Sequence, residues 1–175
     1  MIELKAQMIK IFPKDKNGFT DPLKEAYNFA KLPAIFLAGP CPRKNYENDW
    51  RNEAFKYLEE AGYNGIVFSP TNALFDKEAK DELKHQTDRE FNAMCVANRI
   101  VFWIPRDKDN PAFTTNIELG SYLWPDRINR IVVGMPDWAE KTEYIKLRLQ
   151  RLKKSWYTDL REEINAVVKE LNNDR

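Results

Sequence analysis

Residues 32–40, with the sequence LPAIFLAGP, give the clearest indication of the fold. Their centre, Ala34 to Ala38, is an uninterrupted apolar run that Gly39 and Pro40 bring to an end. Such a run, with no alternation of polar residues, is typical of a strand that is buried on both faces in a parallel sheet. Three later stretches show the same pattern and also end in proline: GIVFSP (65–70), RIVFWIP (99–105) and RIVVGMP (130–136).

Helical patterns separate these apolar runs. NDWRNEAFKYLEEAGY (48–63) has apolar residues at helical spacing on one face, and its glycine stands where a C-terminal cap belongs. Residues 76–98 predict a long helix, and TTNIELGSYLW (114–124) predicts a short one. In the long helix we expect these residues to face inward: Leu83, Phe91, Met94 and Ala97. Near the N-terminus, MIKIF (8–12) predicts a short strand, followed by a helix that Asp21 caps and Pro22 begins.

The alternation of strands and helices predicts an α/β fold with a parallel sheet and right-handed crossovers. We expect one domain over residues 1–175, with a core at about 30–135, an N-terminal extension at 1–31 and a helical extension at 137–175. The helical extension holds two amphipathic helices, which pack on the sheet or on a second subunit. Ligands of such sheets bind beyond the carboxyl ends of the strands. The expected site therefore lies among the loops that follow the first three buried runs.

Composition excludes several classes of protein. The net charge of +1 argues against a nucleic-acid-binding protein, which usually carries a basic surface. Cys41 and Cys95 do not make a disulfide framework and suggest free thiols in a reducing compartment. The charged opening MIELKAQMIKIF does not resemble a signal peptide, and no apolar run approaches the length of a membrane span. We expect a cytoplasmic protein, or one of the host cytoplasm if a phage encodes it, without nucleic-acid or membrane partners.

Glu118, in TTNIELG (114–120), has two interpretations. Thr115 and Glu118 have the spacing of a capping box, in which each side chain bonds the backbone N–H of the other residue. Alternatively, a carboxylate at the start of a helix that follows a strand faces the ligand crevice, where the helix dipole favours its ionised form. That ionised form suits a nucleophile.

The remaining chemical groups are sparse. Gly39 allows close approach to the backbone, and Arg43 has the donors to hold a phosphate or a carboxylate. Asp88 and Glu90 precede the inward face of the long helix, so that one of them can face the crevice. His85 is the one histidine and lies in a polar stretch, so we expect no zinc site and no other metal or cofactor.

Four motifs, taken together, resemble the nucleoside 2-deoxyribosyltransferase-like family. They are, in order, IFLAGP (35–40), WRNEAFKYLEEAGYNGIVFSP (50–70), ANRIVFWIP (97–105) and TTNIELG (114–120). The N-terminal stretch also resembles the branch of this family found in phages and bacteria. The resemblance implies a flavodoxin-like or Rossmann-like three-layer sandwich with a mostly parallel sheet. It also implies cleavage or transfer of the N-glycosidic bond of a (deoxy)nucleoside or nucleoside 5′-monophosphate, by an enzyme that is often a homo-oligomer.

The resemblance further assigns roles to residues. The family's nucleophile falls on Glu118, which would form a glycosyl-enzyme intermediate, and the carboxylate that protonates the departing base falls on Glu90 or Asp88. The expected substrate contacts are Phe36, Gly39, Pro40, Arg43, Thr114, Thr115 and Asn116. Arg43 and the two threonine hydroxyls would suit a 5′-phosphate.

Two departures from the family pattern bear on the reaction. Phe36 stands where the transferases carry a tyrosine that bonds the nucleophile, so Thr115 or Asn116 would have to position Glu118 instead. The base-side aspartate of the transferases also has no clear counterpart. Two alternatives to a transferase therefore stay open: a nucleotide N-hydrolase and a non-catalytic nucleotide-binding module.

Overall fold

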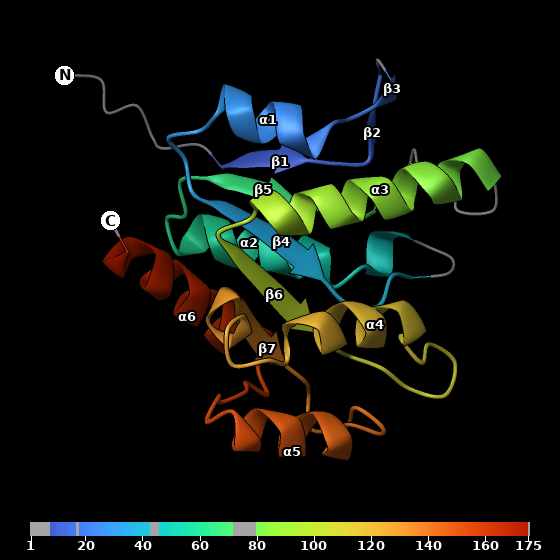
Figure 1. Cartoon of the computed structure of the whole chain (residues 1–175), viewed down its shortest axis with the longest axis vertical. Coiled ribbons are helices and arrows are strands. Elements are labelled where there is room, and N and C mark those ends of the chain that lie inside the picture. Colours follow the sequence, from blue (N-terminus) through green and yellow to red (C-terminus); the bar gives the residue numbers. More distant parts are fainter. Residues whose placement is uncertain (1–7, 17, 43–45, 72–79, 175) are drawn as a thin grey trace.

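The computed structural model describes residues 8–16, 18–42, 46–71 and 80–174. Its central sheet has the order β1-β5-β4-β6-β7, and every neighbouring pair is parallel. The strands are β1 (Ile9–Ile11), β4 (Ala34–Ala38), β5 (Ile66–Phe68), β6 (Arg99–Trp103) and β7 (Ile131–Gly134) (Figure 1). The prediction of an α/β fold with a flavodoxin-like, mostly parallel sheet is confirmed.

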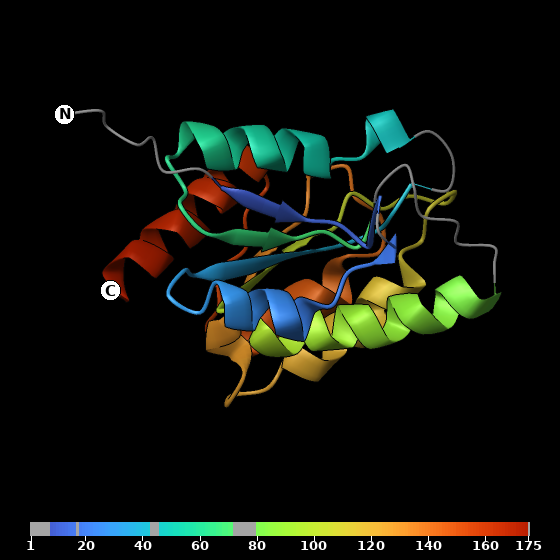
Figure 2. The same cartoon turned by 90° about the horizontal axis from the view of Figure 1, so that it is seen from above.

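Helices cover both faces of this sheet and make three layers. Figure 2 shows α2 (Arg51–Glu60) and α6 (Leu160–Asn173) on one side. The other side carries α1 (Pro22–Asn28), α3 (Lys80–Val96) and α4 (Phe113–Tyr122). The helix α5 (Glu143–Arg151) packs against the same core as α4. The smaller elements are an antiparallel pair, β2 (Lys14–Asp15) and β3 (Gly18–Phe19), and two 3₁₀ turns, η1 (Tyr46–Asn48) and η2 (Ile128–Arg130).

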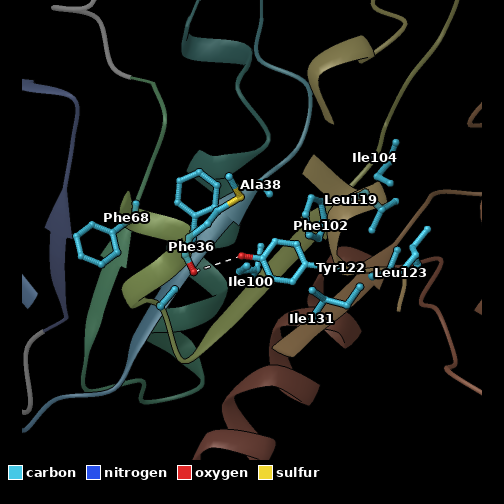
Figure 3. Packing of buried hydrophobic residues seen from close by; sticks show 14 of the residues in the cluster. Phe36, Ala38, Phe68, Ile100, Phe102, Ile104, Leu119, Tyr122, Leu123 and Ile131 are labelled. Atoms are coloured by element: carbon cyan, nitrogen blue, oxygen red, sulfur yellow. Dashed lines mark hydrogen bonds between the residues drawn. The ribbon is translucent and has the colours of Figure 1, made fainter. Parts of the chain in front are cut away.

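Alternate residues of each strand enter different cores, because successive side chains of a strand point to opposite faces. On β4, Phe36 and Ala38 join the core under α3 and α4, while Ile35 and Leu37 join the core under α2 and α6. Figure 3 shows the first of these cores, in which Phe36 lies beside β5 and β6. Burial on both faces explains why these strands read as continuous apolar runs.

The C-terminal helix α6 packs on the sheet of its own chain. Its apolar stripe belongs to the core shared with β6, β7 and α2: Leu160, Ile164, Val167, Val168 and Leu171. Asp159 caps this helix by accepting a hydrogen bond from the backbone N–H of Glu162 at 3.0 Å. Of the two expected packing partners, the sheet is therefore the one that the structure shows for α6.

Several helix details differ from prediction. Asp21 does cap α1, with Pro22 at its first position, as expected. In α3, however, Leu83 and Phe91 are exposed, because the inward face of the helix runs through Glu90, Ala93 and Met94; Ala97, just after the helix, is also buried. In the N-terminal half of α3 this inward face carries polar residues, so the pattern of apolar residues in the sequence indicates the wrong face. The predicted N-terminal turn of this helix, residues 76–79, lies outside the described residues.

Candidate active site

The strand order of the sheet reverses at β4, and a cavity lies at that point. The chain passes from β4 to β5 on one side and then returns to β6 on the other side. In open α/β sheets this reversal leaves a crevice beyond the carboxyl ends of the two strands. A cavity of about 320 Å³ occupies the crevice, within the size range of small-molecule sites. The turn after β4, the loop after β6, and the helices α3 and α4 line it.

Two glutamates from different helices meet in this cavity. Glu118 of α4 and Glu90 of α3 both line it, and their side chains share a hydrogen bond. Glu90 is 7% exposed, and its Oε1 accepts a hydrogen bond from Nε2 of Gln86, one helical turn earlier, at 2.6 Å. Two carboxyl groups in contact are more stable when they share one proton than when both are ionised.

Burial, together with the charge and the hydrogen bond of the neighbouring Glu90 carboxylate, raises the pKa of Glu118 to about 8. The positive charge of Arg51 opposes this rise. At neutral pH Glu118 is therefore mainly protonated when the cavity is empty. The expected effect of the helix dipole, which favours the ionised form, is opposed by burial and by the second carboxylate.

The capping-box interpretation of Glu118 is also wrong. The helix α4 begins at Phe113, and its N-cap is Ala112, which has a left-handed backbone (φ 56°) and makes no side-chain cap bond. Thr115 is consequently the third helical residue and is buried at the cavity wall. Glu118 lies half way along the helix, one turn beyond the N-terminal positions that a cap requires.

Gly39 forms part of the cavity wall and brings two backbones together. Its φ is 151°, and a Cβ on it would lie 2.1 Å from the carbonyl oxygen of Trp103 at the end of β6. No side chain fits there, so glycine is required for the close approach of the turn to β6. Asn110 ties the same two loops together, since its Nδ2 donates to the carbonyl of Cys41 at 3.3 Å.

The structure brings most of the predicted site residues to the cavity. Those that line it are Phe36, Gly39, Pro40, Glu90, Thr114, Thr115 and Glu118. Asp88 is exposed and does not line it. Asn116 points elsewhere and accepts a hydrogen bond from Arg106 at 2.7 Å, at the wall of a second cavity. Arg43 lies outside the described residues.

Sequence reasoning missed other residues of this region. Cys41, Gln86, Thr87 and Asn110 line the cavity, and Arg51 is fully buried beside it. Gln86 and Thr87 could have been found, because they precede Glu90 by about one helical turn and therefore share its face. Arg51 gave no such signal, since an arginine within a polar helical turn ordinarily remains exposed.

No group of three metal-ligating side chains occurs within residues 8–16, 18–42, 46–71 and 80–174. In the same part of the chain, no helix is both long enough and apolar enough to cross a membrane.

The family profile described as nucleoside 2-deoxyribosyltransferase like matches residues 32–138 of this chain. The matched part begins just before β4 and ends after β7, so it contains both glutamates and the turn after β4. No curated protein matches the chain. The match covers more than half of the chain and agrees with the observed fold, and the chain therefore belongs to the nucleoside 2-deoxyribosyltransferase-like family.

Proposed function

We propose that this protein cleaves the N-glycosidic bond of a (deoxy)nucleoside or a nucleoside 5′-monophosphate, with Glu118 as the nucleophile. The observation that carries the proposal is the Glu118–Glu90 pair in the cavity at the reversal of the sheet order. Glycoside cleavage with a covalent intermediate needs two carboxyl groups in different protonation states. Membership of the family supports a nucleoside as the substrate class.

In the first step, a carboxylate oxygen of Glu118 attacks C1′ of the sugar. The new bond joins that oxygen to C1′, while the bond from C1′ to the base nitrogen breaks and its electron pair leaves with the base. Glu90 donates the proton that neutralises the departing base. In the second step, water or a second base attacks C1′, Glu90 accepts the proton of this nucleophile, and Glu118 leaves as a carboxylate.

The raised pKa of Glu118 places one demand on this sequence. Glu118 must lose its proton before it attacks, and Glu90 must hold a proton when the base departs. Transfer of the proton along the hydrogen bond from Glu118 to Glu90 meets both needs. The carboxyl groups of retaining glycosidases are about 5 Å apart, farther than a hydrogen bond reaches. Entry of the sugar between the two groups would therefore separate them with the proton on Glu90.

Chromatographic assays of released base test the proposal. The purified protein is incubated with each nucleoside, deoxynucleoside and 5′-monophosphate, with and without a second free base. Glu118→Gln should lower turnover at least about 1,000-fold, because an amide is not a nucleophile. Glu143→Gln, at an exposed position on α5 away from the cavity, is the matched control and should retain full activity. Absence of base release by the wild-type protein with every substrate would exclude the function.

The same assay assigns the acid. Glu90→Gln should lower turnover, while Asp88→Asn should not, because Asp88 is exposed and does not line the cavity. The opposite result would assign the role to Asp88. Product analysis separates a hydrolase, which yields free sugar or sugar phosphate, from a transferase, which yields a new nucleoside only when a second base is present.

A non-catalytic nucleotide-binding module is the second candidate function, and two observations favour it. Phe36 supplies no hydroxyl at the cavity wall, and the raised pKa keeps Glu118 protonated at neutral pH. Calorimetry decides between the two functions. Tight nucleotide binding without turnover, and with an affinity that Glu118→Gln leaves unchanged, would establish the binding module.

A further inference from the structure

Arg51, the first residue of α2, is 1% exposed and makes every one of its contacts inside the protein. Its Nε donates to the carbonyl of Leu37 at 3.0 Å, and its Nη2 donates to the carbonyl of Gly39 at 2.8 Å. Nη1 donates to the carbonyl of Pro40 at 3.3 Å and to Oδ1 of Asp49 at 3.0 Å. The guanidinium therefore holds the end of β4 and the turn that follows it.

The ion pair extends this network to the neighbouring strand. Oδ2 of Asp49 accepts a hydrogen bond from Oγ1 of Thr71 at 2.6 Å, and Thr71 belongs to the loop after β5. Asp49 and Thr71 are both buried. Arg51 and Asp49 thus connect the carboxyl ends of β4 and β5 directly behind Gly39 and Pro40, which line the cavity.

The charge of Arg51 acts on the glutamate pair from this position. Arg51 interacts electrostatically with both Glu118 and Glu90. Within the described residues, the other charged or titratable groups around the pair include Arg89 on α3, Tyr122 on α4 and Cys41, which lines the same cavity and interacts with Arg51. Of these groups, Arg51 is the cation that acts on Glu118 and favours its ionised form.

A purely structural role is a poor explanation for this arginine. Burial of an ion pair costs several kcal/mol of desolvation per charge, and apolar residues of similar volume are often at least as stabilising. Neighbouring residues of α2, such as Ala54, Phe55 and Leu58, fill the core with apolar groups. A buried positive charge near two carboxyl groups that must differ in protonation is instead expected where that charge contributes to the function of the site.

We propose that Arg51 is a positioning residue of this site, a buried cation that holds the Gly39–Pro40 turn at the wall of the cavity that Glu118 and Glu90 share. The inference rests on the proposed function for its catalytic meaning, because it takes Glu118 as the reactive group. Arg51 acts through Glu118 and the backbone of the turn and does not touch the substrate. The negative charge of Asp49 partly cancels the positive charge of Arg51, so the Arg51–Asp49 ion pair does not present a full positive charge to the glutamates.

Titration of Glu118 by ¹³C NMR tests the inference without any need for turnover. Protein labelled at the glutamate side-chain carboxyl carbons is titrated in the ligand-free state, and the Glu118 signal is assigned by its loss in Glu118→Gln. Arg51→Gln should raise the pKa of Glu118 by about one unit, since a nearby opposite charge shifts a carboxyl pKa by about one to three units. Arg51→Lys keeps the charge and should shift this pKa less than Arg51→Gln does.

Asp49→Asn provides the opposite perturbation and retains every hydrogen bond from Arg51 to the backbone. Loss of the Asp49 charge exposes more of the field of Arg51, so the pKa of Glu118 should fall. This variant keeps the test decisive if Arg51→Gln does not fold. An unchanged Glu118 titration in Asp49→Asn, or in a folded Arg51→Gln, would overturn the inference.

Turnover separates the geometric role from the electrostatic role. Arg51→Lys loses most of the bonds to the turn, so its kcat should fall at least tenfold while its KM and the pH at which activity rises stay near the wild-type values. If the wild-type protein releases no base, the proposed function fails, and the NMR shifts still decide the link between Arg51 and Glu118.

Discussion

Glu163, in the first turn of α6, offers the most sharply defined prediction about stability. Its side chain is completely buried, and within the described residues neither carboxyl oxygen has a hydrogen-bond partner. Gly134 of β7 makes room for it, since a Cβ at that position would lie 2.5 Å from Oε2 of Glu163. Burial raises the pKa of Glu163 well above its ordinary value. The native protein therefore retains the proton of this carboxyl group at pH values where the unfolded chain has already lost it.

The magnitude of the effect follows from proton linkage. In the unfolded chain Glu163 ionises near its ordinary pKa of 4.5, whereas in the native protein it keeps its proton up to the raised pKa. Between these two values the native state binds one more proton than the unfolded state. The contribution of Glu163 to the free energy of unfolding is complete below pH 4.5 and falls by about 1.4 kcal/mol for each pH unit above it. The loss ends once the pH exceeds the native pKa.

Urea denaturation at pH 5, 6 and 7 measures this slope. The free energy of unfolding of Glu163→Gln, whose amide does not titrate, should gain about 1.4 kcal/mol relative to the wild type for each pH unit up to the native pKa of Glu163. Glu163→Met should show the same trend without a polar group to bury. Glu162→Gln, at the exposed neighbouring position, should follow the wild type at each pH. Parallel pH profiles for the wild type and Glu163→Gln would show that the pKa of Glu163 is not raised in the native protein.

Three further predictions concern the cavity. Gly39→Ala should lower the free energy of unfolding by about 2 kcal/mol or more, because its Cβ would lie 2.1 Å from a carbonyl oxygen of β6. Gly120→Ala, at an exposed position in α4 with nothing within 4 Å of the added Cβ, should instead raise it by about 0.5 to 1 kcal/mol. Both are measured by chemical denaturation, and similar losses in the two variants would contradict the argument. Glu90→Gln should lower the pKa of Glu118 from about 8, because the amide carries no negative charge, and ¹³C NMR reads this shift directly. Alkylation of Cys41, which lines the cavity, should slow when a nucleoside monophosphate binds, whereas the exposed cysteine of α3 should react at an unchanged rate. Equal protection of both cysteines, measured by mass spectrometry, would place the ligand elsewhere.

The strands could be predicted from the sequence because each of them is buried on both faces. A residue such as Phe36 has apolar neighbours before and after it, and this local pattern alone indicates a parallel sheet. The order of the strands is not local. That β1 pairs with β5 at the edge of the sheet depends on contacts between residues far apart in the chain.

The polar residues of the site were predictable only in part. Glu118 and Glu90 follow from the resemblance to the family, but their mutual hydrogen bond depends on how α3 and α4 pack. The start of α4 was misplaced because Thr115 and Glu118 fit a capping box, while the actual cap is the left-handed backbone of Ala112. Arg51 was missed because the carbonyls and the carboxylate that accept its hydrogen bonds come together only in the fold.

The resemblance to the family implies a tyrosine at the position of Phe36, and the glutamate pair suggests what its hydroxyl would change. A hydroxyl at that position would donate a hydrogen bond to Glu118 and favour its ionised form. Phe36 lines the cavity and donates no hydrogen bond, and Glu118, whose pKa is raised, bonds to Glu90. The positive charge of Arg51 then becomes the main influence that favours ionisation. Phe36→Tyr should therefore lower the pKa of Glu118 and reduce its sensitivity to Arg51→Gln, and an unchanged sensitivity would show that the two influences are independent.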